Sequence, residues 1–168
     1  DVDHLQFAWQ TPIDLDAVSG ALESRAYSMV AVVHHETSTG MLNPVAAIAK
    51  LAHANGAIVQ VDAISSIGAE DIRAKEWGVD ILVGASGKAL SAMPGVGILV
   101  VRSELLDTLT ESSGAGHYLD LYNHFYYMRN YTQTPNTPAV HVFISLHASL
   151  REITALGVER FRETIRQR

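Results

Sequence analysis

Short, mainly apolar runs predict three buried strands, at 28–34, 57–61 and 79–83. Runs of this length that are mainly apolar, rather than strictly alternating, are typical of parallel strands covered on both faces. A fourth run, 97–101, follows the third after too few residues for a crossover helix. We therefore expect the fourth strand to lie antiparallel to its neighbour.

Apolar positions at helical spacing follow the first strand and predict a helix from Pro44 to Asn55. Proline suits the first turn of a helix, and the Asn55-Gly56 pair is a common helix end. Weaker patterns of the same kind predict helices at 16–25, 103–109, 139–153 and 156–168. The alternation of strands and helices predicts an α/β fold, a mostly parallel sheet with one antiparallel strand and helices on both faces.

Four segments have less regular patterns. Residues 1–10 alternate loosely between apolar and polar positions and are predicted as a strand, and 112–116 is predicted as a break. Five tyrosines occur within 117–131, and two prolines within 132–138. Dense tyrosine is more typical of an interface than of a chemical site, and two prolines predict a shaped loop.

Asp62 and Lys88 each follow a predicted buried strand, Asp62 directly and Lys88 after a few small residues. The carboxyl ends of parallel strands share one edge of a sheet, so the two side chains should face one crevice there. A lysine that forms a Schiff base and a carboxylate that keeps a ring nitrogen protonated are what pyridoxal phosphate requires. Spacing alone leaves a plainer reading open, a turn aspartate and a solvated lysine.

Composition narrows the possible functions. With 168 residues, 48% of them hydrophobic and 18% charged, the chain can bury the core of one globular domain. No run approaches the ~18 apolar residues of a membrane span, and no signal-peptide pattern is present, so a cytoplasmic protein is predicted. A net charge of −6 argues against nucleic acid as a partner, the absence of cysteine excludes thiolate catalysis, and eight scattered histidines predict no metal site.

Three motifs resemble, in order, those of the class V aminotransferases, a family of the fold-type-I pyridoxal-phosphate enzymes. They are HHETSTGMLNP at 34–44, VDAISSIG at 61–68 and ASGKALSAMPGVGILVV at 85–101. Within the family, the sequence most resembles the 2-aminoethylphosphonate:pyruvate, alanine:glyoxylate and serine:glyoxylate transaminases. The ordered set of three is much more specific than any single motif.

The resemblance implies a role for several residues. Lys88 would carry the cofactor as a Schiff base and move the substrate proton, and Asp62 would pair with the pyridinium nitrogen. Thr37 matches a hydroxyl residue on the ring-oxygen side, and Ile64 matches an apolar residue packed against the ring face. Without the resemblance, Thr37 and Ile64 would be read as a turn hydroxyl and a core side chain.

Two more residues are assigned by the resemblance alone. Ser66 matches a substrate-pocket position, and Thr137 matches a threonine that reaches the phosphate held by the neighbouring subunit, which implies a homodimer. Two positions depart from the family pattern. Gly87 stands before the lysine, where relatives commonly have Gln, Asn or His, and Thr134 stands where some have a phosphate-binding tyrosine.

The resemblance implies an aminotransferase that uses pyridoxal 5'-phosphate and moves an amino group from a small amino acid or aminophosphonate to a 2-oxo acid, pyruvate or glyoxylate. Residues 1–168 are expected to be the central part of the large, cofactor-binding domain, without the N-terminal segment and the C-terminal small domain. One alternative is a truncated, non-catalytic domain that keeps the fold and dimer surface. Another is a cysteine desulfurase-like lyase, which typically needs a catalytic cysteine and a histidine before the lysine; this sequence has neither.

Overall fold

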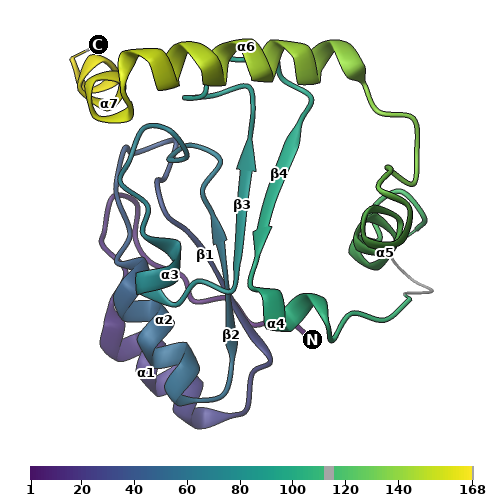
Figure 1. Cartoon of the computed structure of the whole chain (residues 1–168). Helices are drawn as coiled ribbons and strands as arrows, with labels where there is room; N and C mark the ends of the chain where they lie inside the picture. The colour runs from purple at the N-terminus through teal and green to yellow at the C-terminus, as the bar shows by residue number, and fades with distance from the viewer. Residues whose placement is uncertain (112–115, 168) are drawn as a thin grey trace.

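A four-stranded mixed sheet forms the centre of the computed structural model, which describes residues 1–111 and 116–167 (Figure 1). Its strands lie in the order β1-β2-β3-β4. They are, in that order, Met29–Val33, Ile58–Asp62, Ile81–Ala85 and Gly97–Val101. The first three are parallel neighbours and β4 is antiparallel to β3, as predicted.

Helices α1, α2 and α3 lie together on one side of this sheet (Figure 1). They span Leu15–Ser24, Val45–Ala54 and Ala74–Trp77. The predicted apolar stripe of α2 is the buried one, and it packs on inward side chains of the strands to form the core. The main members of this core are Val45, Ala49, Ala52, Val59, Val61 and Leu82. The core thus lies beneath β2, which ends at Asp62, and β3, which is followed by the loop that carries Lys88.

The C-terminal half supplies four more helices: α4 at Ser103–Leu106, α5 at Leu121–Tyr131, α6 at Val140–Leu156 and α7 at Val158–Arg166. Figure 1 shows α6 running across the ends of β3 and β4, and α5 on the side of the sheet away from α1 and α2. The α/β architecture with one antiparallel strand is therefore confirmed.

Several element predictions need correction. Residues 1–10 form no strand, because no neighbouring strand pairs with them. Helix α4 is shorter than predicted, and its N-cap is Arg102, whose side chain makes no capping bond. The tyrosine-rich stretch contains a helix, α5, that begins where the carboxylate of Asp120 accepts the Tyr122 N–H at 3.0 Å. The predicted break at 112–116 falls mostly on residues 112–115, outside the described residues.

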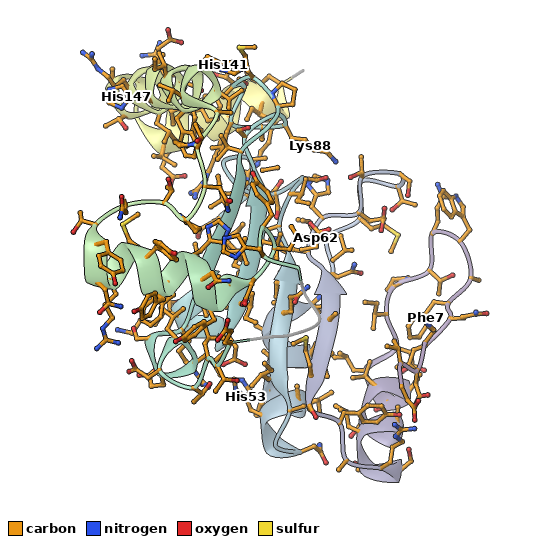
Figure 2. All side chains as sticks on the ribbon, turned by 90° about the vertical axis from the view of Figure 1, so that its right-hand side faces the viewer. Phe7, His53, Asp62, Lys88, His141 and His147 are labelled. Atoms are coloured by element: carbon orange, nitrogen blue, oxygen red, sulfur yellow. The ribbon has the colours of Figure 1, made fainter. Side chains whose placement is uncertain are left out.

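A buried carboxylate joins several elements at the amino ends of β2 and β3. The side chain of Asp80 is fully buried; it accepts the Val59 N–H at 2.7 Å and lies 2.8 Å from His53 Nε2. Arg102, just after β4, lies 2.9 Å from the other carboxylate oxygen. Figure 2 shows His53 at this end of the sheet, far from Asp62 and Lys88. The Asp80 contacts therefore tie α2, β2, β3 and β4 together away from the candidate site.

Candidate active site

The loop that carries Lys88 is held closely between β3 and β4. The hydroxyl of Ser86, which is fully buried, donates to the Met93 carbonyl at 2.7 Å and accepts the Val96 N–H at 3.2 Å. A Cβ at Gly87 would lie only 2.8 Å from Cβ of Pro94, so this position suits glycine alone. The turn therefore holds the residues before and after Lys88 in one arrangement.

The amino group of Lys88 lies at a meeting point of three chain segments. Its Nζ donates to Oγ1 of Thr37 and to Oγ of Ser65, each at 2.8 Å, and the two hydroxyl oxygens are 2.5 Å apart. Thr37 belongs to the loop after β1 and Ser65 to the loop after β2. The structure thus brings together the three sequence motifs at one amine.

Asp62 lies at the carboxyl end of β2, the central partner of β1 and β3. Its Oδ1 accepts the Ile64 N–H at 2.8 Å, and its backbone carbonyl accepts the His34 N–H at 2.8 Å. Within residues 1–111 and 116–167, no hydrogen bond to Oδ2 is found. Figure 2 shows Asp62 and Lys88 at the same end of the sheet. One carboxylate oxygen thus fixes the turn, and the other remains for a ligand.

The other predicted residues fall into two groups. Ile64 is half-buried and directly follows the Asp62 turn, so it lies beside the carboxylate. Ser66, in contrast, is fully buried, and its hydroxyl donates to the Ala63 carbonyl at 3.4 Å. Thr137 is exposed in the loop that leads from α5 to α6, and in the described part of the chain no hydrogen bond links it to Lys88 or Asp62.

Sequence reasoning missed Ser65. It assigned a role to the next residue in VDAISSIG, Ser66, whereas the structure turns the Ser65 hydroxyl to the lysine. Two adjacent serines after a strand end face different directions, and the pattern alone does not say which of them faces the crevice. The signal available was only that Ser65 lies in the same loop as Asp62.

Two further ionisable groups border the site. The hydroxyl and backbone N–H of Ser38 donate to Glu36 and hold the pKa of this carboxyl below its usual value, and the nearby charge of Lys88 adds to the effect. Burial lowers the pKa of His34, whose ring packs edge-on against Trp77 at 5.2 Å. The environment therefore favours the ionised form of Glu36 and the neutral form of His34.

The donor set fits an aldehyde cofactor that has a basic ring nitrogen. An exposed amine, a carboxylate with one uncommitted oxygen, and two hydroxyls occur at one strand edge. In the described residues, no three His, Asp or Glu side chains are grouped as metal ligands. Nor does the described part contain a helix long and apolar enough to cross a membrane.

Comparison with known structures places this fold among the fold-type-I aminotransferases. The alanine–glyoxylate aminotransferase of Nostoc sp. superposes with a TM-score of 0.84 at 27% identity, over 92% of this chain and 42% of that one. The pyridoxamine–pyruvate aminotransferase of Mesorhizobium loti gives 0.79 at 28% identity, over 90% and 40%. The class is thus an α/β enzyme fold that uses pyridoxal phosphate.

The family follows from the sequence match. The model of the family Aminotransferase class-V matches residues 1–168, so the chain belongs to the class V aminotransferases. It is also 40% identical over 147 residues to 2-aminoethylphosphonate–pyruvate transaminase 2 of Paraburkholderia xenovorans, a match that covers 87% of this chain. The matched part makes up 40% of that relative, so the chain spans well under half its length.

Proposed function

We propose that this chain is part of a pyridoxal-phosphate-dependent aminotransferase and that residues 1–168 are the central part of its large, cofactor-binding domain. The observation that carries the proposal is the convergence of three motif loops at the amine of Lys88, at the strand edge where Asp62 lies. Ligands of α/β sheets typically bind at this edge, outside the carboxyl ends of the strands. The family match supports the same reading.

Each residue at the edge has a distinct task in this proposal. The cofactor, when bound, acts as an electron sink for the substrate Cα. Asp62 would hold the proton on the ring nitrogen through its uncommitted oxygen, and Lys88 would bond the aldehyde carbon and later carry the proton to and from Cα. The hydroxyls of Thr37 and Ser65 would orient the Lys88 amine and the side of the cofactor ring that carries the oxygen. Ile64 would pack on the face of the cofactor ring.

The sequence prediction gave Ser66 a substrate-pocket role and gave Ser65 none, and we propose a different assignment. The buried Ser66 hydroxyl is bonded within its own turn, so in this proposal Ser66 supports the loop. Ser65 is the residue of the pair whose hydroxyl lies at the lysine, and it is the better candidate for contact with cofactor or substrate. We therefore assign to Ser65 the contact role that the sequence predicted for Ser66.

For the substrates, we infer an aminophosphonate or small amino acid as donor and a 2-oxo acid as acceptor. The curated relative is named a 2-aminoethylphosphonate–pyruvate transaminase, and the structural neighbours are named for alanine with glyoxylate and for pyridoxamine with pyruvate. 2-Aminoethylphosphonate with pyruvate is therefore the first pair to test.

A cytoplasmic homodimer is the assembly that we propose. Thr137 would complete the phosphate site of the partner subunit, and its place on an exposed loop beside α5 leaves it accessible. Helix α5 and its flanking turn expose large apolar side chains, among them Tyr118, Tyr126, Met128 and Tyr131. A second copy would cover this surface. Light scattering at micromolar concentration measures the assembly, and a strictly monomeric protein would contradict it.

Two other functions remain as alternatives with distinct signatures. A desulfurase-like lyase is disfavoured because Gly87 stands before Lys88, where that class typically has a histidine, and residues 1–168 contain no cysteine. A non-catalytic domain that keeps only the fold would bind no cofactor, and it would show protein absorbance alone. Absorbance therefore separates a cofactor-binding enzyme from the empty scaffold.

The test is a half-reaction followed by absorbance. Pyridoxal phosphate added to the protein should produce a visible band, 2-aminoethylphosphonate should remove that band, and pyruvate should restore it while alanine accumulates. Lys88→Ala is the matched control and should give no band once unbound cofactor has been removed. If the wild-type band forms but no amino donor changes it, the cofactor site stands and the transaminase assignment fails.

A further inference from the structure

One face of α6 is pressed against the loop that carries Lys88, here called the lysine loop (86–96). Val142, Ser145 and Ser149 lie three and four residues apart, so they share this face. Oγ of Ser145 accepts the Met93 N–H at 3.0 Å, and the Ser149 hydroxyl donates to the Leu90 carbonyl. The two serines therefore bond the lysine loop through its backbone.

The backbone of Met93 is held from both sides. Its carbonyl accepts from Ser86 at the end of β3, and its N–H donates to Ser145 on α6. Beside it, a Cβ at Gly95 would lie 3.3 Å from Cγ1 of Val142, which leaves the loop little room to shift toward the helix. The loop is thus fixed between the sheet and α6.

Helix α6 is itself anchored, as a positioning element must be. Ile153 near its end is buried, and after Gly157 the chain continues into α7. There Arg162 lies 3.4 Å from Asp71, and Arg166 lies 3.3 Å from Glu70. Both carboxylates belong to the segment that follows the Asp62 turn. Helices α6 and α7 together therefore contact this segment and the lysine loop.

We propose that Ser145 and Ser149 are positioning residues for Lys88, and we call this pair the α6 clamp. A lysine amine sits on a flexible four-carbon stem, so its position depends on the backbone that carries it. Misplacement of a reacting group by about 1 Å can cost about 100-fold in rate. The clamp fixes the Leu90 and Met93 backbone and thereby keeps Lys88 within reach of Thr37 and Ser65. The proposal rests on the proposed function for what Lys88 does.

The first test needs no cofactor. Acetic anhydride is added to the apo protein, and acetylation of Lys88 is followed by peptide mass spectrometry, with the exposed Lys50 and Lys75 as internal references. In Ser145→Ala with Ser149→Ala, Lys88 should lose its hydroxyl partners part of the time and react about 2- to 10-fold faster, the range for loss of one hydrogen bond. The reference lysines should not change.

The second test measures how fast the cofactor bonds to Lys88, and here the expected change is a decrease. The same variants are incubated with pyridoxal phosphate and borohydride, and the rate of covalent labelling at Lys88 should fall about tenfold. Ser149→Thr retains a hydroxyl and should restore much of the rate. Thr154→Ala is the matched control. The Thr154 hydroxyl lies on the same helix, but it donates to the Leu150 carbonyl of α6 itself and not to the lysine loop. That control should behave as wild type.

Faster acetylation with slower cofactor labelling separates a positioning role from general loosening. Unchanged rates at Lys88 would overturn the proposal. If the double variant fails to fold, each single variant decides the question. A uniform rise of acetylation at all three lysines would show that the serines hold the fold rather than the loop, and this result would also overturn the proposal. Wild-type protein that is never labelled by the cofactor, while acetylation responds as expected, would contradict the proposed function and leave the clamp in place.

Discussion

Ser65 and Ser66 are neighbours in the chain, but only Ser65 has its hydroxyl at the amine of Lys88. We predict that Ser65→Ala weakens binding of pyridoxal phosphate by about 2- to 10-fold, the effect of one hydrogen bond, with little change in stability. Ser66→Ala should instead lower the free energy of unfolding by about 1 kcal/mol. Absorbance titration and urea unfolding measure the two effects. The reverse pattern would return the substrate role to Ser66.

His34 makes the stability of the fold depend on pH. Burial lowers its pKa from 6.5 in the folded chain, while Glu70 opposes this shift and His35 adds to it. Below about pH 6.5 the unfolded chain therefore takes up the proton more readily, so stability is lost as pH falls through this range. His34→Asn should flatten the dependence, and the exposed His141→Asn should leave it unchanged. Urea unfolding from pH 7.5 to about 5 tests this.

At the level of elements, buried runs were the most predictable part. The positions of the strands and of α2 were predictable because each is marked by an apolar run or stripe. The predicted burial of the strands on both faces was wrong: β1 has no buried residue, and β2 and β3 are buried only at alternate positions. Helix α5 was missed because its tyrosines form no single buried stripe, although the Asp120 N-cap was a usable signal. Asp62 and Lys88 were predictable at one edge from the strand ends, whereas Ser65 depends on how a loop turns.

The lysine loop gives an element-level prediction. A Cβ at Gly87 would lie 2.8 Å from the Pro94 Cβ and 2.9 Å from its Cα, so Gly87→Ala forces the backbone apart. Overpacking of this kind costs about 1–3 kcal/mol of unfolding free energy. Gly97→Ala is the control, because its added Cβ meets nothing within 4 Å. Equal losses in thermal or urea unfolding would contradict this account of the turn.

For the molecule as a whole, the Asp80 contacts hold the sheet and α2 together at the end away from the site. Removing a buried partner costs about 3–5 kcal/mol, and the partial exposure of Arg102 and His53 reduces this. We predict that Asp80→Ala costs about 3 kcal/mol of unfolding free energy. Asp107→Ala, which breaks the exposed pair with Arg129, should cost less than about 1 kcal/mol. A similar loss in both would show that burial does not matter here.

The central claim is that pyridoxal phosphate binds at the edge formed by Asp62 and Lys88. Borohydride trapping followed by peptide mass mapping tests it most directly, because it locates the bonded lysine. We predict a single labelled lysine, Lys88, in the wild-type chain, no label in Lys88→Ala, and a strongly reduced label in Asp62→Ala with the fold retained. Labelling at Lys50 or Lys75 instead, or equal labelling of all lysines, would contradict the account.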